Sequence, residues 1–303
     1  MKPNTLSLLA FAILGCAWIP RLSAEPQVFF DDFSYASSAQ MEARGWTLRT
    51  APGWPGIPGA LWTKAAVAFH DDPSRPGNRF LRMTSRTDGP GGSTWQTQIC
   101  QQRKFKDGTY AARIHFMTNP ARGPAGDGVV ESFYTISPLI APWDQQYSEC
   151  DFEYLPAGGW GANGPALFTT TWRTYSPEPH WKKDNVFKFD PGDKQGWHTL
   201  VMQMADGTVS YYIDGRELAS HGGRYYPRVL MSINFNLWFI NGASLASHER
   251  REYQEDIDWV YFEKDRVAPV EVEKRVQTLR GGGVGFKDTV TPPDPALPCS
   301  CDT

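Results

Sequence analysis

Short alternations of apolar and polar residues run along most of this chain, and Gly, Pro, Asn or Asp residues separate them. A period of two places every second side chain on the same face of a β-strand. One run, 208–213, lies between two tight turns, Asp206-Gly207 and Asp214-Gly215. We predict strands within the ranges 28–30, 79–83, 108–117, 128–136, 197–203, 208–213, 229–238 and 257–263.

The strand-like runs do not alternate with helical patterns, and only 36–44 has the pattern of a short helix. Many short strands joined by turns are typical of two packed antiparallel sheets. The sequence therefore predicts an all-β sandwich of jelly-roll type. We place this single domain at 25–264, and 303 residues are enough to build it.

The N-terminus has the pattern of a signal peptide over 1–24. Lys2 precedes an apolar stretch at 6–19, and Ala24 offers a small residue for cleavage. The apolar stretch is too short for a comfortable membrane span. Lipid attachment at Cys16 is the alternative, but Leu14 fits the usual small residue there poorly. We expect a secreted, periplasmic or cell-surface protein.

After 264 the composition changes. Charged residues fill 270–279, three glycines follow at 281–283, and 291–298 is rich in proline. We interpret 265–303 as a poorly ordered Gly/Pro-rich tail without an assigned role.

Four cysteines follow the signal segment: Cys100, Cys150, Cys299 and Cys301. Their spacing does not determine any disulfide pairing. Cys150 is expected to face the core as a small apolar residue. Cys299 and Cys301 lie in the tail, and with no second Cys pair or His beside them they are weak evidence for a metal site.

Composition narrows the expected partner. The formal charge is −3, and the basic residues are scattered, so nothing suggests a nucleic-acid partner. Twelve Trp, 12 Tyr and 17 Phe make the chain rich in aromatic residues, as sugar-binding surfaces are.

Candidate chemistry lies in Glu149-Cys150-Asp151-Phe152-Glu153. In a strand the three carboxylates share one face, while Cys150 and Phe152 point to the other. The first and third Cα atoms would lie about 13 Å apart. Two Glu side chains leaning together approach the roughly 5–5.5 Å separation of a retaining glycosidase's carboxylates.

The alternative interpretation of this segment is an ordinary half-buried strand with a solvated acidic face. Like charges in a row repel one another, so a merely solvated strand usually mixes signs or uses Thr and Ser. We therefore favour the catalytic interpretation.

The order of several further segments resembles glycoside hydrolase family 16, the jelly-roll endo-glycanases that include lichenases, laminarinases, agarases and xyloglucan-modifying enzymes. The resemblance covers about 28–263. The matching segments are Phe30-Asp31-Asp32-Phe33, Gly108-Thr109-Tyr110-Ala111-Ala112-Arg113, 128–133, 149–153, Trp197-His198-Thr199, Tyr212-Ile213-Asp214-Gly215, Asn236-Leu237-Trp238 and Asp258-Trp259-Val260.

This resemblance implies a concanavalin-like sandwich with a concave substrate cleft. It implies that Glu149 is the nucleophile, Glu153 the general acid/base, and Asp151 the residue that holds Glu149 in position. Candidate sugar-binding residues are Trp143, Trp172, Asn236 and Trp238. His198 is expected to be a structural or rim residue instead, and Trp259 a structural one. No cofactor is expected for catalysis, and the expected partner is a polysaccharide bound by a monomer.

The resemblance also suggests a structural calcium ion at Asp258, although one carboxylate is thin support for it. The acidic strand has the unbulged spacing of lichenases and xyloglucan enzymes, which tilts the expected substrate toward a β-1,3-1,4- or β-1,4-glucan. Three features depart from the family pattern. The segment Ser210-Tyr211-Tyr212-Ile213-Asp214-Gly215 lacks the Trp of the family's pattern. Glu131 is expected to add a charge near the cleft, and the Gly-rich loop 156–165 to cap or narrow it.

Three functions remain open at this point: hydrolysis, transglycosylation through the same intermediate, and non-catalytic carbohydrate binding on a lectin-like sandwich. Three converging carboxylates favour an enzyme over a lectin.

Overall fold

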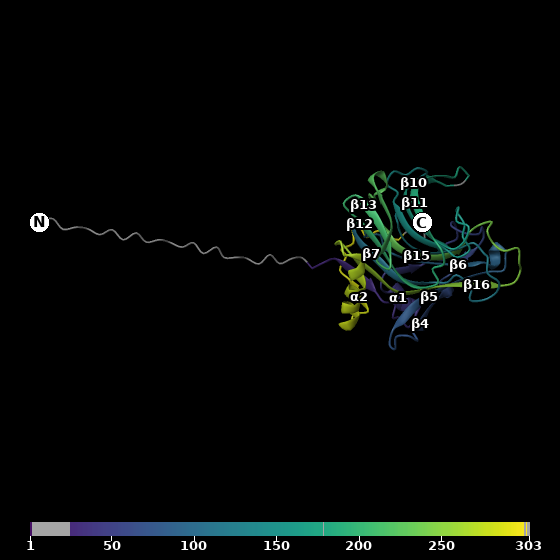
Figure 1. Ribbon diagram of the computed structural model, residues 1–303, viewed down its shortest axis with the longest axis horizontal. Coiled ribbons are helices and arrows are strands. Elements are labelled where there is room, and N and C mark those ends of the chain that lie inside the picture. The colour runs from purple at the N-terminus through teal and green to yellow at the C-terminus, as the bar shows by residue number, and fades with distance from the viewer. Residues whose placement is uncertain (2–24, 178, 300, 302–303) are drawn as a thin grey trace.

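The computed structural model describes Met1 and residues 25–177, 179–299 and 301. Within them, 17 strands form two curved layers that are connected by hydrogen bonds into one continuous sheet. Every pair of strands is antiparallel except β3 (Leu61–Trp62) with β6 (Trp95–Gln101), which are parallel. Figure 1 shows the layers, with β15, β6, β10 and β11 above β16 and β5. The predicted all-β sandwich of jelly-roll type is confirmed.

The layer that carries the acidic strand contains seven strands. In spatial order these are β2 (Trp46–Leu48), β6, β15 (Ser232–Phe239), β8 (Val129–Ile136), β9 (Glu149–Leu155), β10 (Ala166–Ser176) and β11 (Lys182–Pro191). We call its outer, hollowed side the concave face.

The second layer crosses behind it. Its strands are β14 (Arg216–Gly222), β13 (Thr208–Ile213), β12 (Gly196–Ala205), β7 (Gly108–Phe116), β16 (Arg251–Glu263), β5 (Arg79–Thr87), β4 (Val67–Asp71), β1 (Val28–Asp31) and β17 (Phe286–Asp288). The helical elements are α1 (Ser38–Glu42), α2 (Val272–Gly281), η1 (Lys64–Ala66), η2 (Gly91–Ser93), η3 (Gly223–Tyr225) and η4 (Pro269–Glu271).

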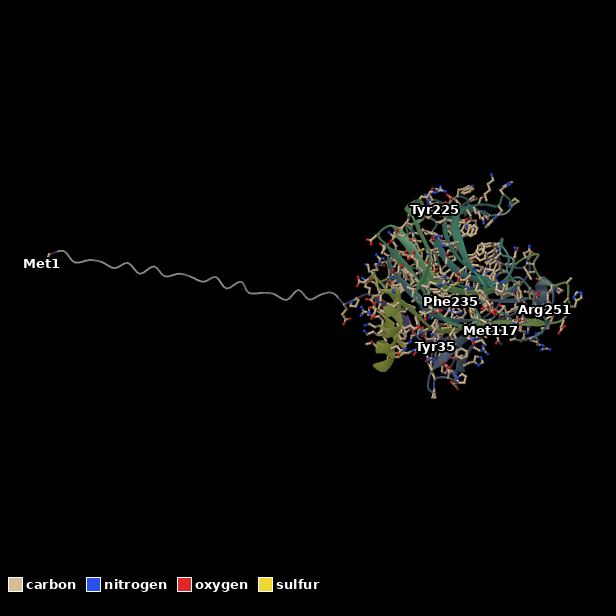
Figure 2. All side chains as sticks on the ribbon, in the orientation of Figure 1. Met1, Tyr35, Met117, Tyr225, Phe235 and Arg251 are labelled. Carbon is tan, nitrogen blue, oxygen red and sulfur yellow. A yellow bond between two sulfur atoms is a disulfide. The ribbon has the colours of Figure 1, made fainter. Side chains whose placement is uncertain are left out.

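The core lies between the layers. Phe133 of β8 stacks on Phe235 of β15 at 5.1 Å between ring centroids, and Phe152 of β9 lies on its other side at 6.3 Å. Phe235 is labelled near the middle of the molecule in Figure 2. Cys150 is a free, buried cysteine in the same core, as the alternation of β9 predicts. This packing turns the opposite side chains of β9 toward the concave face.

The position of Glu131 differs from the one expected from the sequence. It was expected near the cleft, but on β8 it alternates with Ser132 and shares the inward side with Phe133. It is fully buried, and Glu255 of β16 approaches it from the second layer. Adjacent residues of a strand point to opposite faces, so a shift of one position decides whether Glu131 faces the cleft or the core. Only the strand register shows which position it takes.

The segment expected to be a poorly ordered tail is folded. It forms η4, α2 and β17, and β17 pairs with β1. Val272 and Val276 of α2 are buried in a cluster with Trp259, and Val290 reaches the main core. Figure 1 shows α2 beside β7 and β12. Apolar residues three or four positions apart give a helix a face to bury, and this face outweighs the charged composition.

Of the predicted signal segment 1–24, all but Met1, including Cys16, lies outside the described residues. In the described part of the chain, no helix has both the length and the apolar character needed to cross a membrane.

Candidate active site

The three carboxylates of β9 lie side by side on the concave face. Glu149 pairs in register with Trp172 of β10, Asp151 with Thr170, and Glu153 with Phe168. The register of β9 with both neighbours is continuous, so the expected unbulged geometry is present. Alternate residues of a regular strand project in the same direction, which brings the three acids together.

Glu149 is held by an aromatic hydroxyl. The hydroxyl of Tyr147 donates a hydrogen bond to Oε2 of Glu149. Burial raises the pKa of Glu149, and the Tyr147 hydrogen bond opposes part of that rise by favouring the carboxylate. Of the three acids, Glu149 is therefore the one whose ionised form is supported by a tyrosine hydroxyl, which comes from the loop just before β9.

Asp151 is the most enclosed of the three, with a side chain almost fully buried. Its Oδ2 accepts a hydrogen bond of 2.9 Å from Nε1 of Trp172, while Oδ1 has no clear hydrogen-bond partner among the described residues. Burial and then the charges of Glu149 and Glu153 raise the pKa of Asp151 well above its ordinary value. A proton on Asp151 relieves the repulsion among the three carboxylates.

Glu153 lines a pocket on the concave face. Burial raises its pKa, the charge of Glu149 raises it further, and Lys183 of β11 opposes the shift. The environment therefore separates the two glutamates, because a hydrogen bond supports the anion of Glu149 while a neighbouring charge supports the protonated form of Glu153.

Aromatic side chains wall this pocket on several sides. Its lining includes Glu153, Lys183, Phe168, Phe187, Trp54, Trp160, Trp172, Trp181 and Trp238. Flat apolar rings beside a few polar groups are suited to the C–H faces and hydroxyls of sugars.

Trp54 lies between Trp181 and Trp238 in the lining of the pocket. It comes from the loop after β2, yet its ring lies 6.0 Å from Trp181, which precedes β11, and 6.5 Å from Trp238 of β15. On another side, Trp160 lies 6.3 Å from Trp238. The loop 156–165, which was expected to cap or narrow the cleft, therefore contributes Trp160 to the pocket.

Two of the predicted sugar-binding residues, Trp172 and Trp238, line this pocket. Asn236 lies on the concave face, in register with Glu153 through Ser132, but is almost fully buried there. Its Nδ2 donates to the hydroxyl of Tyr134 at 3.2 Å, which also accepts from Nε2 of Gln98 at 2.7 Å. Trp143 is exposed and lies outside the residues that line the pocket. Its backbone has φ of 60° in the loop before β9, and its N–H donates to the carbonyl of Tyr175.

Sequence reasoning missed Trp54, Trp160 and Trp181 as pocket residues. Trp54 and Trp160 lie in loops interrupted by Gly and Pro, where an aromatic ring has no strand to carry it into the core. Each of the three remains exposed by more than a third of its surface. Isolated tryptophans in Gly/Pro-rich loops were the signal that could have identified two of them.

The surroundings of Asp258 do not fit a calcium ion. Its carboxylate lies within 3.5 Å of guanidinium nitrogens of Arg75, Arg113 and Arg280, and its Oδ1 also accepts from Asn78 at 2.9 Å. Calcium prefers a shell of oxygen ligands, whereas these neighbours are cationic or donate hydrogen bonds. The arginines neutralise Asp258, so the suggested metal role is corrected to a structural ion-pair cluster.

Two residues expected to be structural have such positions. His198 of β12 contacts Oδ2 of Asp214 through Nδ1 at 2.7 Å, in the second layer. Trp259 is buried in the cluster beneath α2.

Neither the protein-family models nor the curated proteins contain a match to this sequence. Solved structures do match. A prokaryotic β-1,3-1,4-glucanase (lichenase) from a mouse hindgut metagenome is 18% identical with a TM-score of 0.55, covering 78% of this chain and 99% of its own.

Two further structures extend the comparison. A glycoside hydrolase family 16 endo-glucanase from Bacteroides ovatus, in complex with G4G3G-2F-DNP, is 18% identical with a TM-score of 0.56, covering 77% of this chain and 99% of its own. The kappa-carrageenase from Pseudoalteromonas carrageenovora, in complex with an oligotetrasaccharide of kappa-carrageenan, is 13% identical with a TM-score of 0.54, covering 82% and 99%. The resemblance read from the order of the motifs is thus confirmed in three dimensions, and the chain has the jelly-roll fold of the glycoside hydrolase family 16 enzymes.

Proposed function

We propose that this protein is a secreted, retaining endo-glycosidase that hydrolyses a polysaccharide, with a β-glucan as the favoured substrate. The observation that carries the proposal is the row of Glu149, Asp151 and Glu153 on one face of β9, with Glu153 opening into a pocket walled by tryptophans. The fold of the neighbouring structures supports it at the level of architecture.

In the proposed reaction, Glu149 attacks the anomeric carbon and Glu153 gives its proton to the leaving oxygen. The glycosidic bond breaks as the bond to Glu149 forms. Glu153, now ionised, takes a proton from water, and the resulting hydroxide displaces Glu149 with net retention of configuration. The raised pKa of Glu153 supports the acid role, and the Tyr147 hydrogen bond supports the anionic nucleophile.

Asp151 is proposed as a positioning residue. Its raised pKa favours a protonated carboxyl beside Glu149, and Trp172 fixes its orientation through the 2.9 Å hydrogen bond to Oδ2. A neutral Asp151 leaves Glu149 as the charged member of that pair. The loss of this proton during turnover is not required by the scheme.

The test measures reducing-end release from barley β-glucan, lichenan, xyloglucan, laminarin and agarose by the mature protein, with Glu149→Gln alongside. We expect release from a β-glucan that disappears in the variant, and a product whose first-formed anomer matches the substrate by NMR. An inverted product, or full activity in Glu149→Gln, contradicts the mechanism.

The same assay separates the alternatives. Longer oligosaccharides formed without net reducing-end release identify a transglycosylase, in which a sugar in place of water accepts the glycosyl group. Retention on a polysaccharide with neither reaction, equal in the wild type and in Glu149→Gln, identifies a carbohydrate-binding protein and overturns the proposal.

A further inference from the structure

Three buried cysteines that are far apart in sequence converge at one end of the concave layer. Cys100 lies on β6, and Cys299 and Cys301 lie at the end of the chain. Their sulfur atoms all lie within 4.8 Å of one another, and each side chain is less than a tenth exposed. Cys299 and Cys301 belong to the same short tail segment. Cys100 is therefore the residue of the sheet that this segment contacts through its cysteines.

The tail follows a definite path to this point. Lys104 contacts the carboxylate of Asp288, and the backbone N–H of Arg103 donates to the carbonyl of Leu297 at 3.2 Å. Nε of Arg103 donates to the carbonyl of Pro298 at 2.9 Å. These contacts hold the chain against the end of β6 immediately before the two tail cysteines, independently of any bond between sulfurs.

Cys100 can reach either tail cysteine. Its Cα lies 6.0 Å from the Cα of Cys299 and 6.3 Å from the Cα of Cys301. Both separations lie within the range of disulfide bonds. A sulfur atom can belong to only one disulfide at a time, so the structure offers Cys100 two alternative partners.

We propose that Cys100, Cys299 and Cys301 form a thiol–disulfide exchange site. Cys100 is bonded to one tail cysteine, and the other remains a thiol that can replace it. Formation of the first bond is a two-electron oxidation of two thiols, coupled to reduction of a small disulfide such as oxidised glutathione to two thiols.

Exchange then needs no further oxidant. The thiolate of Cys301 attacks Sγ of Cys100, the bond from Cys100 to Cys301 forms, and the bond from Cys100 to Cys299 breaks. Cys299 leaves as a thiolate and takes up the proton that Cys301 released to water. The reverse step restores the first pairing, and in both states the tail stays covalently joined to β6.

The exchange site lies on the concave side. Cys100 pairs in register with Asn234 of β15, which pairs with Tyr134 of β8, and Tyr134 pairs with Asp151. Directly paired residues share a face of the sheet. The tail is therefore joined three strands from Asp151, about 14 Å across the same face.

A thiophilic metal ion is the competing occupant of three sulfur ligands. Within the described residues, no fourth His, Cys, Asp or Glu ligand atom joins this group. The two disulfide-range Cα separations favour exchange, and the experiment tests the metal separately.

The experiment is peptide mapping of the full-length protein without reductant. Free thiols are labelled with N-ethylmaleimide in acidic denaturant, which suppresses the thiolate and stops exchange, and the protein is then digested with trypsin. We expect peptide 87–103 to be disulfide-linked to peptide 288–303, with one label on the latter. Cys150, a free core cysteine, is the internal control and must be fully labelled.

Single variants distinguish exchange from one fixed bond. Cys299→Ser and Cys301→Ser should each keep peptides 87–103 and 288–303 linked, because the remaining tail cysteine takes over. Cys100→Ser should abolish the link. Loss of the link in only one of the tail variants shows a fixed disulfide and overturns the proposal.

Three further results also overturn it. Labels on all three cysteines, with bound zinc or copper detected in the purified protein, identify a metal site. The same labels without metal identify three free thiols. A bond between Cys299 and Cys301, with a label on Cys100, shows a tail that is not joined to the sheet.

Discussion

Two pairs of glutamates lie on opposite sides of the layer that carries the acidic strand, and the inner pair includes one residue from the second layer. Glu149 and Glu153 face the concave side, whereas Glu131 on the adjacent strand β8 faces inward toward Glu255. Burial raises the pKa of all four. A raised pKa alone therefore does not mark a catalytic residue in this protein.

The surroundings make the difference. On the concave side, the hydroxyl of Tyr147 donates to Glu149, and Glu153 lines a pocket that admits a ligand. In the core pair, Oε2 of Glu131 accepts from the N–H of Met117 at 3.0 Å, while Oε1 of Glu131 and both oxygens of Glu255 have no clear partner among the described residues. Access for a ligand and hydrogen-bond donors to the carboxylate therefore distinguish a reactive carboxyl group from one that only destabilises the fold.

The largest expected effect is a loss of turnover on substitution of a concave-face glutamate, which substitution of a core glutamate should not cause. Glu153→Ala should lower turnover of a polysaccharide by about 10²–10⁴-fold, because the sugar leaving group loses its proton donor. An aryl glycoside with a good leaving group needs no such proton, so its first step should be retained. Initial rates on both substrates check this.

Glu131→Gln is the matched control from the opposite face, and it should leave turnover unchanged. If Glu131→Gln, while still folded, loses as much activity as Glu153→Ala, the division between the two faces is wrong.

The second effect concerns stability. Burial raises the pKa of Glu255 well above its ordinary value, so the folded chain keeps a proton that the unfolded chain releases as pH rises. This contribution is fully present at acidic pH and is lost as pH rises toward the folded-state pKa. Glu255→Met removes the titrating group and should stabilise the protein by about 1–4 kcal/mol at alkaline pH, and by less at acidic pH.

Urea unfolding of wild type and Glu255→Met at acidic and alkaline pH measures this difference. A gain that does not grow with pH contradicts the assignment of a protonated core carboxyl. Glu131 is left unchanged in this experiment because the N–H of Met117 depends on it.

The third effect tests the aromatic wall that distinguishes the concave side. Trp54→Ala should lower kcat/KM by about tenfold, mainly through KM, because one stacking ring between Trp181 and Trp238 is lost. Trp143→Ala removes another exposed ring, which lies outside the pocket, and should change neither constant. Equal losses in both variants would reassign the sugar path to the Trp143 side.

The smallest effect concerns the orientation of Asp151. Trp172→Phe keeps an aromatic ring but removes the Nε1 donor to Oδ2 of Asp151, which should lower kcat by about fivefold, the value of roughly 1 kcal/mol of hydrogen bonding. Trp181→Phe is the matched change elsewhere in the pocket. Steady-state kinetics in which both variants behave alike would remove the orienting role.

Each strand range predicted from the sequence overlaps a strand of the structure, because the signal for a strand is local. The expected range 208–213 is β13 itself, and the expected helix at 36–44 contains α1. The sequence also predicted that Glu149, Asp151 and Glu153 share a face, since a period of two is a property of any regular strand. Several strands lie outside the predicted ranges, among them β4, β6, β11 and β14. Of these, β11 is largely exposed, with little apolar alternation to reveal it.

What the sequence by itself determined is therefore the arrangement within single strands: the acidic row, the inward Cys150 and the sandwich class. Tertiary structure alone decided which residues from distant segments meet. It brought Trp54, Trp160 and Trp181 to one pocket, surrounded Asp258 with arginines, set Glu131 against Glu255, and carried Cys299 and Cys301 to Cys100. The physical reason is that periodicity specifies the direction of a side chain relative to its own strand, whereas its partners depend on the packing of the whole chain.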